Sequence, residues 1–470
     1  MKVLSILAES ASDVLETIQR HKRVRCVEVR ADKAPSSMNL GAIRKAYSGK
    51  LIFTCRNFQE DSQTVKSLYH KALEEGFDYV DVDIEFMPEL SQIDQDFSSK
   101  LILSFHNYAD SRLSYVMLDR MFQIPAAHYK IGLHVTDVWE TFALLKSSKS
   151  WEKPVLLVLM GEAGEWSRVC YRYFDNPWTY LCDMGVPTAP GQVDTQRWDR
   201  EFGRVPSKKY DLYGILGGQV SHSFSPYFHN QFFKKRKKSC SYQRFPAQDL
   251  ENFFDLCPPW IKGLSVTTPL KRSVVPFLSS YDYLVEASGS CNTMVRDGTA
   301  WIGHNTDASG LRAALDEIMP GWVEKEKVII LGAGGLARSA LAALCDHKEM
   351  IFVWNRTEYK ARDLAEQFGV NFLPTDQRFE LRNTVLIQAT SAGFQDQHVS
   401  PIPPEWLEET TTLVESIYNP RYTLLATRAM EMEIEILQAV DLFRYQAIHQ
   451  QRIWFGDLGF SVEEGQKVLS

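Results

Sequence analysis

The sequence predicts an α/β protein with a closed parallel (β/α)8 TIM barrel in its first part and a Rossmann-type dinucleotide-binding fold in its second. The chain has 470 residues, more than one hydrophobic core usually supports, so at least two domains are expected. Up to about residue 205, short apolar and β-branched runs alternate with amphipathic helical stretches, which indicates successive β-α units. Further along, one strand runs through a glycine-rich turn into a helix.

Eight strands are predicted in the first part, each followed by a helical segment. They are Val3–Leu7, Val24–Arg30, Leu51–Cys55, Tyr79–Glu85, Leu101–Phe105, His128–Ile131, Val155–Met160 and Thr179–Cys182. Eight β-α units in succession are typical of a TIM barrel, whose active site lies at the carboxyl ends of its strands.

Ionisable residues gather at these strand ends. Glu28 and Arg30 finish the second strand, Arg56 follows the third, His106 follows the fifth and Lys130 lies in the sixth. A barrel strand is covered by helices outside and packed inside, so neither face offers Lys130 bulk water. We therefore expect Lys130 to be paired or functional. For His106, a structural histidine at the end of a strand is the alternative interpretation.

A domain boundary is predicted at 195–209, where "TQRWDREFGRVPSKK" combines a last helix with a charged segment containing Gly and Pro. We expect the barrel over 1–205. The second unit begins with the strand and glycine turn of "YGILGG" at 213–218 and is expected to form two parts, over 210–320 and 321–421. The helical tail at 422–470 is expected to fold back onto the earlier of these parts.

The stretch "KVIILGAGGLARSALAAL" at 327–344 carries a G-x-G-x-x-A fingerprint between a strand and a helix. The cofactor-binding residues predicted there are Gly332, Ala333, Gly334, Gly335, Leu336 and Ala337.

A second strand at 350–354 ends in Asn355, Arg356 and Thr357, where the ribose contact belongs. NAD sites usually carry an acidic residue at this point, whereas an Arg with hydroxyl and amide neighbours suits a 2′-phosphate, so NADP(H) is predicted. A surface Arg after a strand is the alternative.

Composition excludes several classes of protein. A hydrophobic fraction of 44%, a charged fraction of 24% and a net charge of −7 exclude a disordered chain and argue against broad nucleic-acid binding. The basic run "KKRKK" at 234–238 is interpreted as a solvated helix end. The eight cysteines form no C-x-x-C pair, which indicates free thiols in a reducing compartment and no metal site. With no signal peptide or membrane-spanning stretch recognised, the prediction is a cytoplasmic protein without membrane partners.

Short motifs extend along both parts of the chain. The first part holds "EVR" at 28–30, "FTCR" at 53–56 with Glu60 beyond it, "SFHN" at 104–107, "YKIG" at 129–132 and "TAPGQ" at 188–192. The second holds "SHSFSP" at 221–226, "SVTTPLK" at 265–271, "CNT" at 291–293, "GHNTD" at 303–307 and "NRT" at 355–357. The first set resembles type I 3-dehydroquinate dehydratase and the second resembles shikimate dehydrogenase. Their order matches the fused enzyme of plants and some bacteria.

For the first part, the resemblance implies that Lys130 attacks the substrate ketone to form a Schiff base, and that His106 moves the protons. An amine attacks only when it is neutral, and desolvation together with the cations Arg30 and Arg56 is expected to favour that form.

The resemblance also supplies binding residues for the barrel. Glu28 and Glu60 fit the family's acidic positions. Arg168 in "EWSRV" is the candidate clamp for the substrate carboxylate, with Thr188 and Gln192 closing over the ring. A surface position is the alternative for Arg168.

For the second part, the resemblance implies a two-lobed shikimate dehydrogenase unit. Its substrate-binding domain covers 210–320, completed by helices from 422–470, and its Rossmann NADP-binding domain covers 321–421. Lys271 is the implied proton donor, with Asp307 as its partner. The implied substrate contacts are Ser223, Ser225, Ser265, Thr267, Asn292, Tyr418 and Gln446.

Two residues depart from the family pattern. Ser265 stands where many shikimate dehydrogenases have Asn, which shortens the reach to the ring hydroxyls. Gln388 replaces the usual Asn of "NATSAG" near the cofactor.

The predicted function is a two-step enzyme that dehydrates 3-dehydroquinate to 3-dehydroshikimate and then reduces this product to shikimate with NADPH. One alternative is a binding protein that kept both folds and lost its chemistry. Such a protein is expected to have lost Lys130, His106, Lys271 or Asp307, yet all four are present. Another alternative is the same chemistry run catabolically with NAD, against which Arg356 argues.

Overall fold

The computed structural model describes residues 1–34, 38–56, 62–86, 95–203, 210–394, 396–409 and 411–469. Its contacts divide the chain into two compact units. The first is Met1–Tyr210 with Gln243–Pro258, and the second is Asp211–Tyr242 with Pro259–Ser470.

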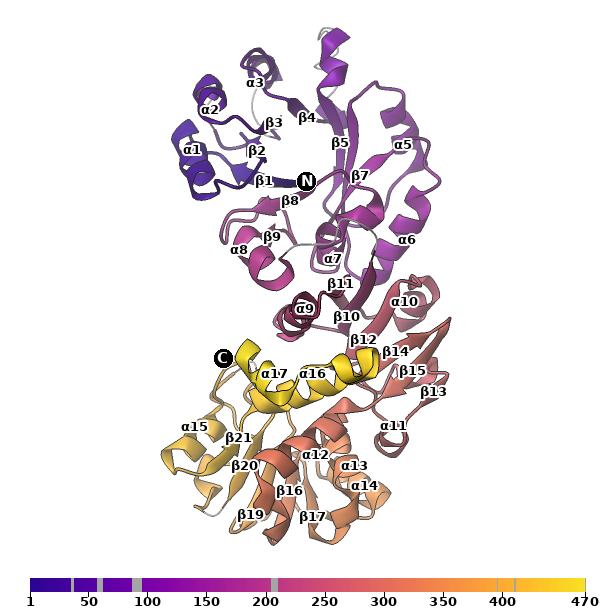
Figure 1. The fold of residues 1–470 in the computed structure, drawn as a ribbon, viewed down its shortest axis with the longest axis vertical. Helices are drawn as coiled ribbons and strands as arrows, with labels where there is room; N and C mark the ends of the chain where they lie inside the picture. Colours follow the sequence, from indigo (N-terminus) through magenta and orange to yellow (C-terminus); the bar gives the residue numbers. More distant parts are fainter. Residues whose placement is uncertain are drawn as a thin grey trace. The chain divides into compact units, whose positions relative to one another are not determined.

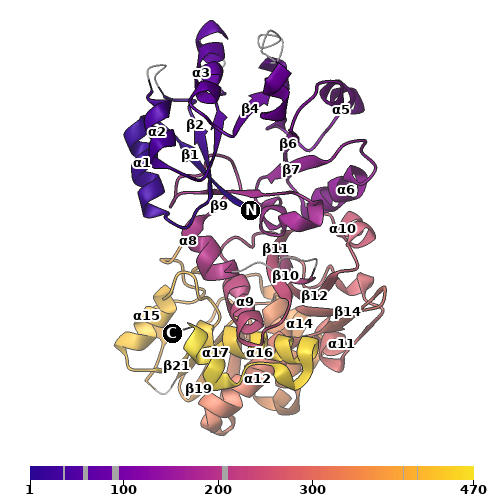
Figure 2. The ribbon, with the colours of Figure 1, turned by 45° about the horizontal axis from the view of Figure 1, so that its top comes forward.

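The first unit is built on one curled sheet of parallel strands (Figure 1). Its strands are β1 (Lys2–Leu7), β2 (Cys26–Arg30), β3 (Lys50–Thr54), β4 (Tyr79–Asp83), β5 (Leu101–Asn107), β6 (His128–His134), β7 (Val155–Met160), β8 (Thr179–Cys182) and the short β9 (Val193–Asp194). The order is β7-β6-β5-β4-β3-β2-β1-β8-β9. The helices are α1 (Ala11–Arg20), α2 (Leu40–Ala46), α3 (Ser62–Glu74), α5 (Tyr115–Phe122), α6 (Val138–Ser148), α7 (Glu165–Val169), α8 (Thr195–Arg197) and α10 (Leu250–Leu256). Figure 2 shows α1, α2, α3, α5 and α6 outside the curled strands.

The predicted barrel fold is confirmed, with one seam. Within the described chain, β7 and β8 are not neighbours in the sheet. Asn176 bridges the gap instead, because its Oδ1 accepts from the backbone N of Leu157 at 3.0 Å and its Nδ2 donates to Leu157 O at 2.8 Å. An apolar layer fills the interior and includes Val3, Ile52, Ile102, Leu156, Trp178 and Tyr180. The barrel is thus a packed core rather than a pore.

The second unit holds two further sheets. The strands of one are β10 (Asp211–Gly217), β11 (Cys240–Pro246), β12 (Ile261–Val266), β13 (Ser280–Tyr281), β14 (Thr293–Asp297) and β15 (Ala300–His304), in the order β11-β10-β12-β14-β15-β13. The strands of the other are β16 (Lys327–Leu331), β17 (Ile351–Trp354), β18 (Asn371–Phe372), β19 (Thr384–Gln388), β20 (Thr412–Glu415) and β21 (Glu435–Leu437), in the order β18-β17-β16-β19-β20-β21. All pairings in this last sheet are parallel, as the Rossmann prediction requires.

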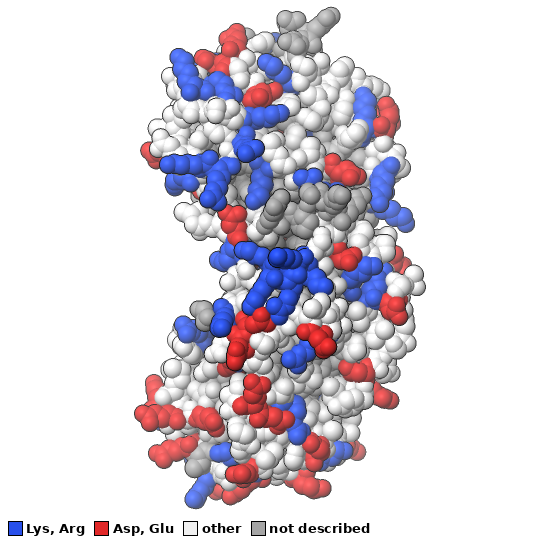
Figure 3. Space-filling model, in the orientation of Figure 1, with Lys and Arg blue, Asp and Glu red and all other residues white. Residues whose placement is uncertain are grey.

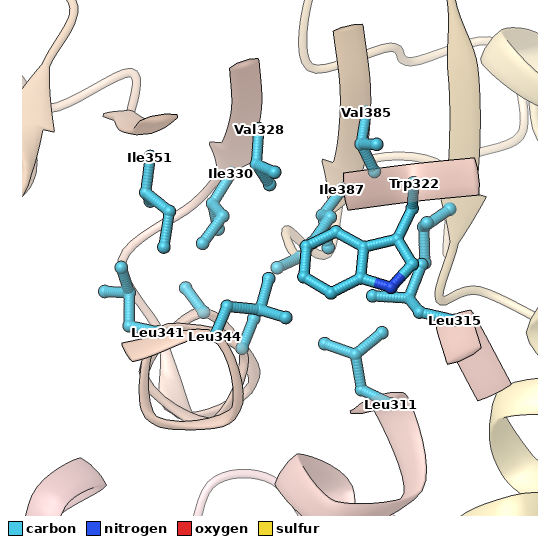
Figure 4. Packing of buried hydrophobic residues seen from close by; sticks show 14 of the residues in the cluster. Leu311, Leu315, Trp322, Val328, Ile330, Leu341, Leu344, Ile351, Val385 and Ile387 are labelled. Carbon is cyan, nitrogen blue, oxygen red and sulfur yellow. The ribbon is translucent and has the colours of Figure 1, made fainter. Parts of the chain in front are cut away.

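Helices cover both sheets of the second unit. They are α9 (Ser225–Lys235), α11 (Tyr283–Ser288), α12 (Thr306–Ile318), α13 (Gly335–Ala343), α14 (Glu358–Phe368), α15 (Leu424–Glu431), α16 (Ala439–Phe455) and α17 (Val462–Leu469). Figure 4 shows side chains of β16, β17 and β19 pointing toward Leu311 and Leu315 of α12 and toward Leu341 and Leu344 beside them. This core joins α12 and α13 to one face of the sheet.

The C-terminal tail divides between the two sheets. Phe443, Ala447 and Ile448 of α16 pack with Phe228 and Phe232 of α9, in the earlier part to which the tail was expected to return. The preceding α15 and β21 instead belong with the last sheet, because Leu425, Ala426 and Ala429 pack in its core with Ile329 and Leu386. The returning segment therefore begins at α16 rather than at residue 422, because the apolar face of α15 matches the last sheet.

The basic run at 234–238 lies at the end of α9. Lys234, Lys235 and Lys237 are exposed, as expected for a solvated helix end. Arg236 has a structural partner, because its guanidinium contacts Glu464 at 2.6 Å and donates to Leu458 O at 2.9 Å. Figure 3 shows both signs of charge on the visible face, together with one compact group of basic side chains.

Candidate active sites

Lys130 lies buried in β6, with its amine held by carboxylates. Its Nζ is 2.6 Å from Asp81 Oδ2 and 3.6 Å from Glu28 Oε1. The same nitrogen lies 4.3 Å above the centre of the Tyr180 ring. The expectation that Lys130 is paired is confirmed, and its closest partner is a residue that sequence reasoning had not selected. In this state the nitrogen is in an ion pair, which must open before the amine can attack a carbonyl.

Asp81 is the fully buried centre of this arrangement. Besides Lys130 it accepts a hydrogen bond from Ser104 Oγ at 2.7 Å and lies 3.4 Å from Arg56 Nη2. Burial by itself raises the pKa of Asp81, but the charges of Lys130 and then Arg56 outweigh it and hold the pKa below its usual range. Asp81 thus lies between the cations Lys130 and Arg56, an arrangement that the sequence did not indicate.

His106 lies within β5, opposite Gly132 in the register with β6. Its Nδ1 is 3.2 Å from Asp83 Oδ2. Burial, with the charges of Arg56 and Lys130 acting in the same direction, lowers the pKa of His106 well below its usual value. Burial also raises the pKa of Asp83 to about 6. A neutral imidazole oriented by a carboxyl group is suited to accept a proton from a bound molecule.

Five residues meet beside this pair, namely Ser5, Glu28, Arg30, Thr188 and Gln192. Ser5 Oγ donates to Glu28 and lies 2.8 Å from Thr188 Oγ1. Arg30 Nη1 donates to Thr188 O at 2.7 Å, and Gln192 Oε1 accepts from the backbone N of Thr188 at 2.8 Å. The structure thus brings the predicted Thr188 and Gln192 next to Glu28 and Arg30.

A cavity of about 340 Å³ shares Arg30 with this group and is lined by Arg30, Asp32, Arg56, Asp83, Glu85, His106 and Tyr108. It combines two guanidinium groups with the imidazole, which suits a small molecule carrying a carboxylate. Tyr108, which sequence reasoning missed, stacks on His106 with ring centres 5.8 Å apart.

Arg30, Arg56 and His106 are the predicted barrel residues that line this cavity, whereas Lys130, Glu28, Thr188, Gln192 and Arg168 are not part of its lining. Arg168 is buried, and its guanidinium donates to the carbonyls of Leu159 at 2.9 Å and Pro190 at 3.0 Å. Burial lowers the pKa of Arg168 to about 10. Its guanidinium supports the loop that carries Thr188, so its role as an anion clamp stays a prediction. Glu60 lies outside the described residues.

In the second unit, Lys271 Nζ lies 2.5 Å from Asp307 Oδ2, as the resemblance implied. Asp307 is in the first turn of α12, and Lys271 O accepts a hydrogen bond from Cys291 N at 2.8 Å. Neither side chain is deeply buried: 18% of that of Lys271 and 12% of that of Asp307 are exposed. The ammonium group can therefore reach a ligand while it stays oriented by the carboxylate.

Asn292 lies next to this pair with its carbonyl oxygen fully engaged. Its Oδ1 accepts from Thr306 N at 2.7 Å, Thr306 Oγ1 at 3.1 Å and Thr293 Oγ1 at 3.0 Å. This fixes the orientation of the amide, so that its NH₂ group is the end left to meet a ligand. Thr267, also predicted, follows β12, and its N donates to Leu216 O at 2.9 Å.

Ser265 does not have the environment that its motif suggested. Its hydroxyl is buried, accepts from Tyr242 OH at 2.6 Å and donates to Gln450 Oε1 at 2.9 Å. The predicted loss of reach toward a substrate ring is therefore accompanied by a structural role between β11, β12 and α16.

The remaining residues predicted to contact the substrate are Ser223, Ser225, Tyr418 and Gln446, on α9, α16 and the loops beside them. Ser225 begins α9, and its N donates to Ser223 Oγ at 3.2 Å. Phe224, between the two serines, has its ring 5.1 Å from that of Tyr418. Gln446 lies on α16 where it crosses Gly310 of α12, one turn beyond Asp307. The residues predicted for this unit's substrate site come from six separate stretches of chain.

The glycine-rich turn fits a dinucleotide. Gly332 has φ +121°, and a Cβ there would lie 2.8 Å from Ala389 O. Gly334, the residue before α13, has open space where a Cβ would be, so a phosphate group can approach the backbone closely. The other fingerprint residues, Ala333, Gly335, Leu336 and Ala337, form the turn and the first turn of α13.

The predicted Arg356 lies at the end of β17, where the ribose of a dinucleotide is expected. Arg356 is exposed after β17, and Asn355 Nδ2 donates to Thr357 O at 2.9 Å, which shapes the turn around it. Gln388 is buried and organises the neighbouring loop, because its Oε1 accepts from Thr390 N at 3.0 Å and its Nε2 donates to Ala392 O at 3.1 Å. Its departure from the family pattern therefore keeps a loop-forming amide.

Sequence reasoning missed Ser5, Asp81, Asp83 and Tyr108. Asp81 and Asp83 had a usable signal, because two acids spaced two apart at the end of a strand lie on one face of it. Ser5 had none, since a single Ser in an apolar strand has no distinguishing pattern. Among the described residues, no group of three His, Cys, Asp or Glu side chains could hold a metal ion. No described helix combines the length and apolar character that a bilayer crossing requires.

Comparisons with known proteins give the same division of the chain. Residues 3–200 match the family model of type I 3-dehydroquinase, 215–294 that of the shikimate dehydrogenase substrate binding domain, and 315–397 that of shikimate / quinate 5-dehydrogenase. A shikimate dehydrogenase (NADP(+)) of Maridesulfovibrio salexigens is 32% identical over 258 residues, which are 53% of this chain and 93% of that protein.

Two further similarities concern a full-length relative and a solved structure. The chloroplastic bifunctional 3-dehydroquinate dehydratase/shikimate dehydrogenase of Arabidopsis thaliana is 27% identical over 496 residues, covering 96% of this chain and 81% of the relative. The crystal structure of shikimate 5-dehydrogenase from Thermus thermophilus in complex with NADP(H) and shikimate has 28% identity and a TM-score of 0.50. It covers 55% of this chain and 98% of its own.

Proposed function

The chain belongs to the shikimate dehydrogenase family, with a type I 3-dehydroquinase region ahead of that part, and we propose that Lys130 and Lys271 are the central residues of its two reactions. It is a bifunctional enzyme of the shikimate pathway. It dehydrates 3-dehydroquinate to 3-dehydroshikimate and reduces the product to shikimate with NADPH. The observation that carries the assignment in the barrel is a buried Lys130 next to a histidine–carboxyl pair at the carboxyl ends of the strands.

The dehydration uses Lys130 as nucleophile. When the substrate binds, Lys130 gives a proton to Asp81 and the neutral amine adds to the carbonyl carbon. The proton then passes from Asp81 to the departing hydroxyl, so that water leaves and a protonated Schiff base forms. This group withdraws electrons, so the neutral His106 can take a proton from the adjacent carbon. The electron pair released then expels the hydroxyl group, which leaves as water with the proton carried by His106. Hydrolysis frees the product and Lys130.

Arg30 and Arg56 supply positive charge in the cavity for the substrate carboxylate. Asp32 orients Arg30, since its Oδ2 accepts from Arg30 Nε at 2.9 Å, and its Oδ1 accepts from the backbone N of Arg56 at 2.6 Å. Thr188 and Gln192 close one side of the site, and Glu28 accepts hydrogen bonds from substrate hydroxyls there.

The reduction takes place at Lys271 and Asp307. Bound NADPH supplies the hydride to the carbonyl carbon. Lys271 donates the proton that turns the carbonyl oxygen into a hydroxyl, and Asp307 holds the ammonium group in place. Asn292 offers its NH₂ group to a ring hydroxyl, while Thr267, Ser223, Ser225, Tyr418 and Gln446 complete the contacts. Gly332, Gly334 and the start of α13 would hold the pyrophosphate of the cofactor, and Arg356 would bind its 2′-phosphate.

A trapping experiment tests the barrel site. Borohydride added during turnover with 3-dehydroquinate should fix a product-derived mass on the peptide that contains Lys130. Lys130→Ala should abolish the dehydration and leave the reduction of added 3-dehydroshikimate intact. A labelled peptide elsewhere, or undiminished dehydration in the variant, would remove Lys130 from the mechanism.

A cytoplasmic location is proposed for this chain. The free, mostly buried cysteines support a reducing compartment. The Arabidopsis relative is named as chloroplastic. Fluorescence of a tagged chain in cells of its source organism is the measurement, and an organellar signal would contradict the proposal.

A further inference from the structure

The motif "GHNTD" supplies Asp307 to the reductase site, but it also contains Asn305, which the proposed mechanism leaves without a task. Asn305 is 1% exposed and caps α12, because its Oδ1 accepts from Ala308 N at 3.0 Å. Its NH₂ group is turned the other way, into the protein. A helix cap needs only the oxygen, so the amide nitrogen requires a separate explanation.

The nitrogen of Asn305 contacts three buried acceptors. Its Nδ2 lies 2.9 Å from each of Ser288 Oγ, Ser290 O and Ser339 Oγ. Ser288 ends α11 and Ser290 follows it, whereas Ser339 lies in the middle of α13. All three serines are 0% exposed. The carboxamide therefore joins the helix that carries Asp307 to the helix whose first turn holds the cofactor.

The same two helices are also joined by apolar contacts. Leu311 and Leu315 of α12 share a core with Leu341 of α13 and Leu344 just after it (Figure 4). Leu315, Leu341 and Leu344 lie toward the carboxyl ends of the two helices, away from Asp307 and the glycine-rich turn. Asn305 and Ser339 form the polar contact nearer to the ends that carry Asp307 and the glycine-rich turn.

The start of α13 also lies close to the proton donor. A Cβ at Gly335 would lie 3.5 Å from Lys271 Cδ and 3.2 Å from Ser290 Oγ. The first helical residue of α13 is thus packed against Lys271 and the loop that leads to Asn292. A small shift of α13 along its axis would change the position of the cofactor relative to Lys271.

We propose that Asn305 is a positioning residue of the reductase, which ties α13 to the amino end of α12 and so holds the cofactor-binding turn in register with Lys271 and Asp307. The proposal rests on the roles assigned to Lys271 and Asp307 above. Hydride and proton must reach one carbonyl group together, and the rate depends steeply on their alignment. Loss of the contact should slow the chemical step more than it weakens binding.

Two serines allow a matched test. Ser339 Oγ and Ser288 Oγ are both buried, both accept from Asn305 at 2.9 Å and both donate to the carbonyl four residues earlier, that of Gly335 at 3.0 Å and that of Leu284 at 2.6 Å. Only Ser339 is on α13. Ser339→Ala should lower kcat of the reduction roughly tenfold, whereas Ser288→Ala should leave kcat within about twofold.

Three further readouts separate positioning from folding. The dissociation constant of NADPH, measured by fluorescence in Ser339→Ala, should stay within about twofold of the wild type, in keeping with a defect in alignment. The deuterium isotope effect with NADPH labelled at the transferred hydrogen should rise, because hydride transfer becomes more rate-limiting. Dehydration by the same preparation should be unchanged. Asn305→Ser, which keeps a capping oxygen but lacks the reach to Ser339, should repeat these results.

The outcomes divide as follows. Unchanged kcat in both Ser339→Ala and Asn305→Ser overturns the proposal, as does an equal loss in Ser288→Ala or a loss of NADPH affinity that accounts for the whole effect. Lys271→Ala is measured alongside. If it keeps full reductase activity, the assignment of the active site fails instead.

Discussion

Gly132 has a function in the site that depends on having no side chain. It lies two residues after Lys130 on the same face of β6 and opposite His106 in β5. A Cβ at this position would lie 2.5 Å from Cδ2 and 3.1 Å from Nε2 of His106. The imidazole can therefore occupy its place next to Asp83 only while residue 132 is glycine.

Gly132→Ala should displace the His106 ring and lower kcat of the dehydration roughly 100-fold, because a shift of about 1 Å in a catalytic group has effects of this size. Reduction by the same protein should be unaffected. An assay that starts from 3-dehydroquinate and one that starts from 3-dehydroshikimate would show the difference. Gly321→Ala is the control, since a Cβ there has no atom within 4 Å. Normal dehydration in Gly132→Ala would mean that His106 is not the proton acceptor.

At this scale the sequence identified the residues with distinctive motifs. Motifs selected Lys130, His106, Lys271 and Asp307, and in the structure each has a charged or polar partner, while their catalytic roles stay predictions. The partners Asp81 and Asp83 were missed, because pairing across neighbouring strands depends on register. The direction of the Arg168 guanidinium could not be predicted either, since its acceptors are backbone carbonyls, which every residue carries.

Among the elements, the strands of the barrel were the most predictable. The bounds of β7 and β8 agree with the prediction, because strands buried on both faces appear as continuous apolar runs. The strand β6 extends to His134, three residues beyond its predicted end, since the glycine within it did not interrupt the pairing. The short β21 was read as part of a helical tail, because three residues are too few to show a period.

The helices α9 and α16 enclose an uncharged histidine. His229 is fully buried, its ring is stacked 4.5 Å from that of Tyr242, and it contacts Gln451 of α16. Burial lowers the pKa of His229 from its ordinary value near 6.5 to about 3. Below pH 6.5 the unfolded chain takes up a proton that the folded unit excludes. The stabilisation is thus complete above pH 6.5 and is lost as the pH falls toward 3.

We expect His229 to make the unfolding free energy of the second unit fall by about 1.4 kcal/mol for each pH unit below 6.5. Urea unfolding, monitored through the loss of NADPH binding at several values between pH 7 and pH 5, measures this slope. In His229→Gln the slope should be smaller by that amount, because the amide does not titrate. Equal slopes in the two proteins would refute this assignment.

At the scale of the molecule, the first unit is assembled from two separate stretches of chain, and four charges lie where they meet. Arg197 contacts Glu165 at 2.7 Å and Glu201 at 3.2 Å, while Arg244 contacts Glu201 at 2.8 Å and Glu165 at 3.3 Å. Only 3% of the Arg244 side chain is exposed. Such a network is strongly destabilised when one member is removed, because a buried charge is left without its partner.

Arg244→Met should lower the stability of the first unit by about 3–5 kcal/mol. The matched control is Arg200→Met, which removes another cation next to Glu201. The side chain of Arg200 is 63% exposed, so its loss should change the stability by only about 0–1 kcal/mol. The temperature at which dehydratase activity is lost gives the comparison. Similar temperatures for both variants would show that the network contributes little.

The sequence predicted a boundary at 195–209 from its charge, Gly and Pro content, and the contacts divide the chain between Tyr210 and Asp211. The return of Gln243–Pro258 to the first unit was not foreseen. Composition records only what is local, whereas this return depends on contacts such as those of Arg244 with residues far earlier in the chain. The limits of the individual domains within the second unit stay predictions.

The seam at Asn176, between β7 and β8, should be the weakest junction between strands of the barrel. Every other junction from β1 to β8 in the described sheet is a ladder of backbone hydrogen bonds, whereas here the side chains of Asn176 and Arg168 and the bond from Gly161 N to Pro190 O connect the two sides. Transient opening of the ring should therefore start between β7 and β8. Deuterium from solvent would label the amides along that line long before those of β3 and β4 on the opposite wall.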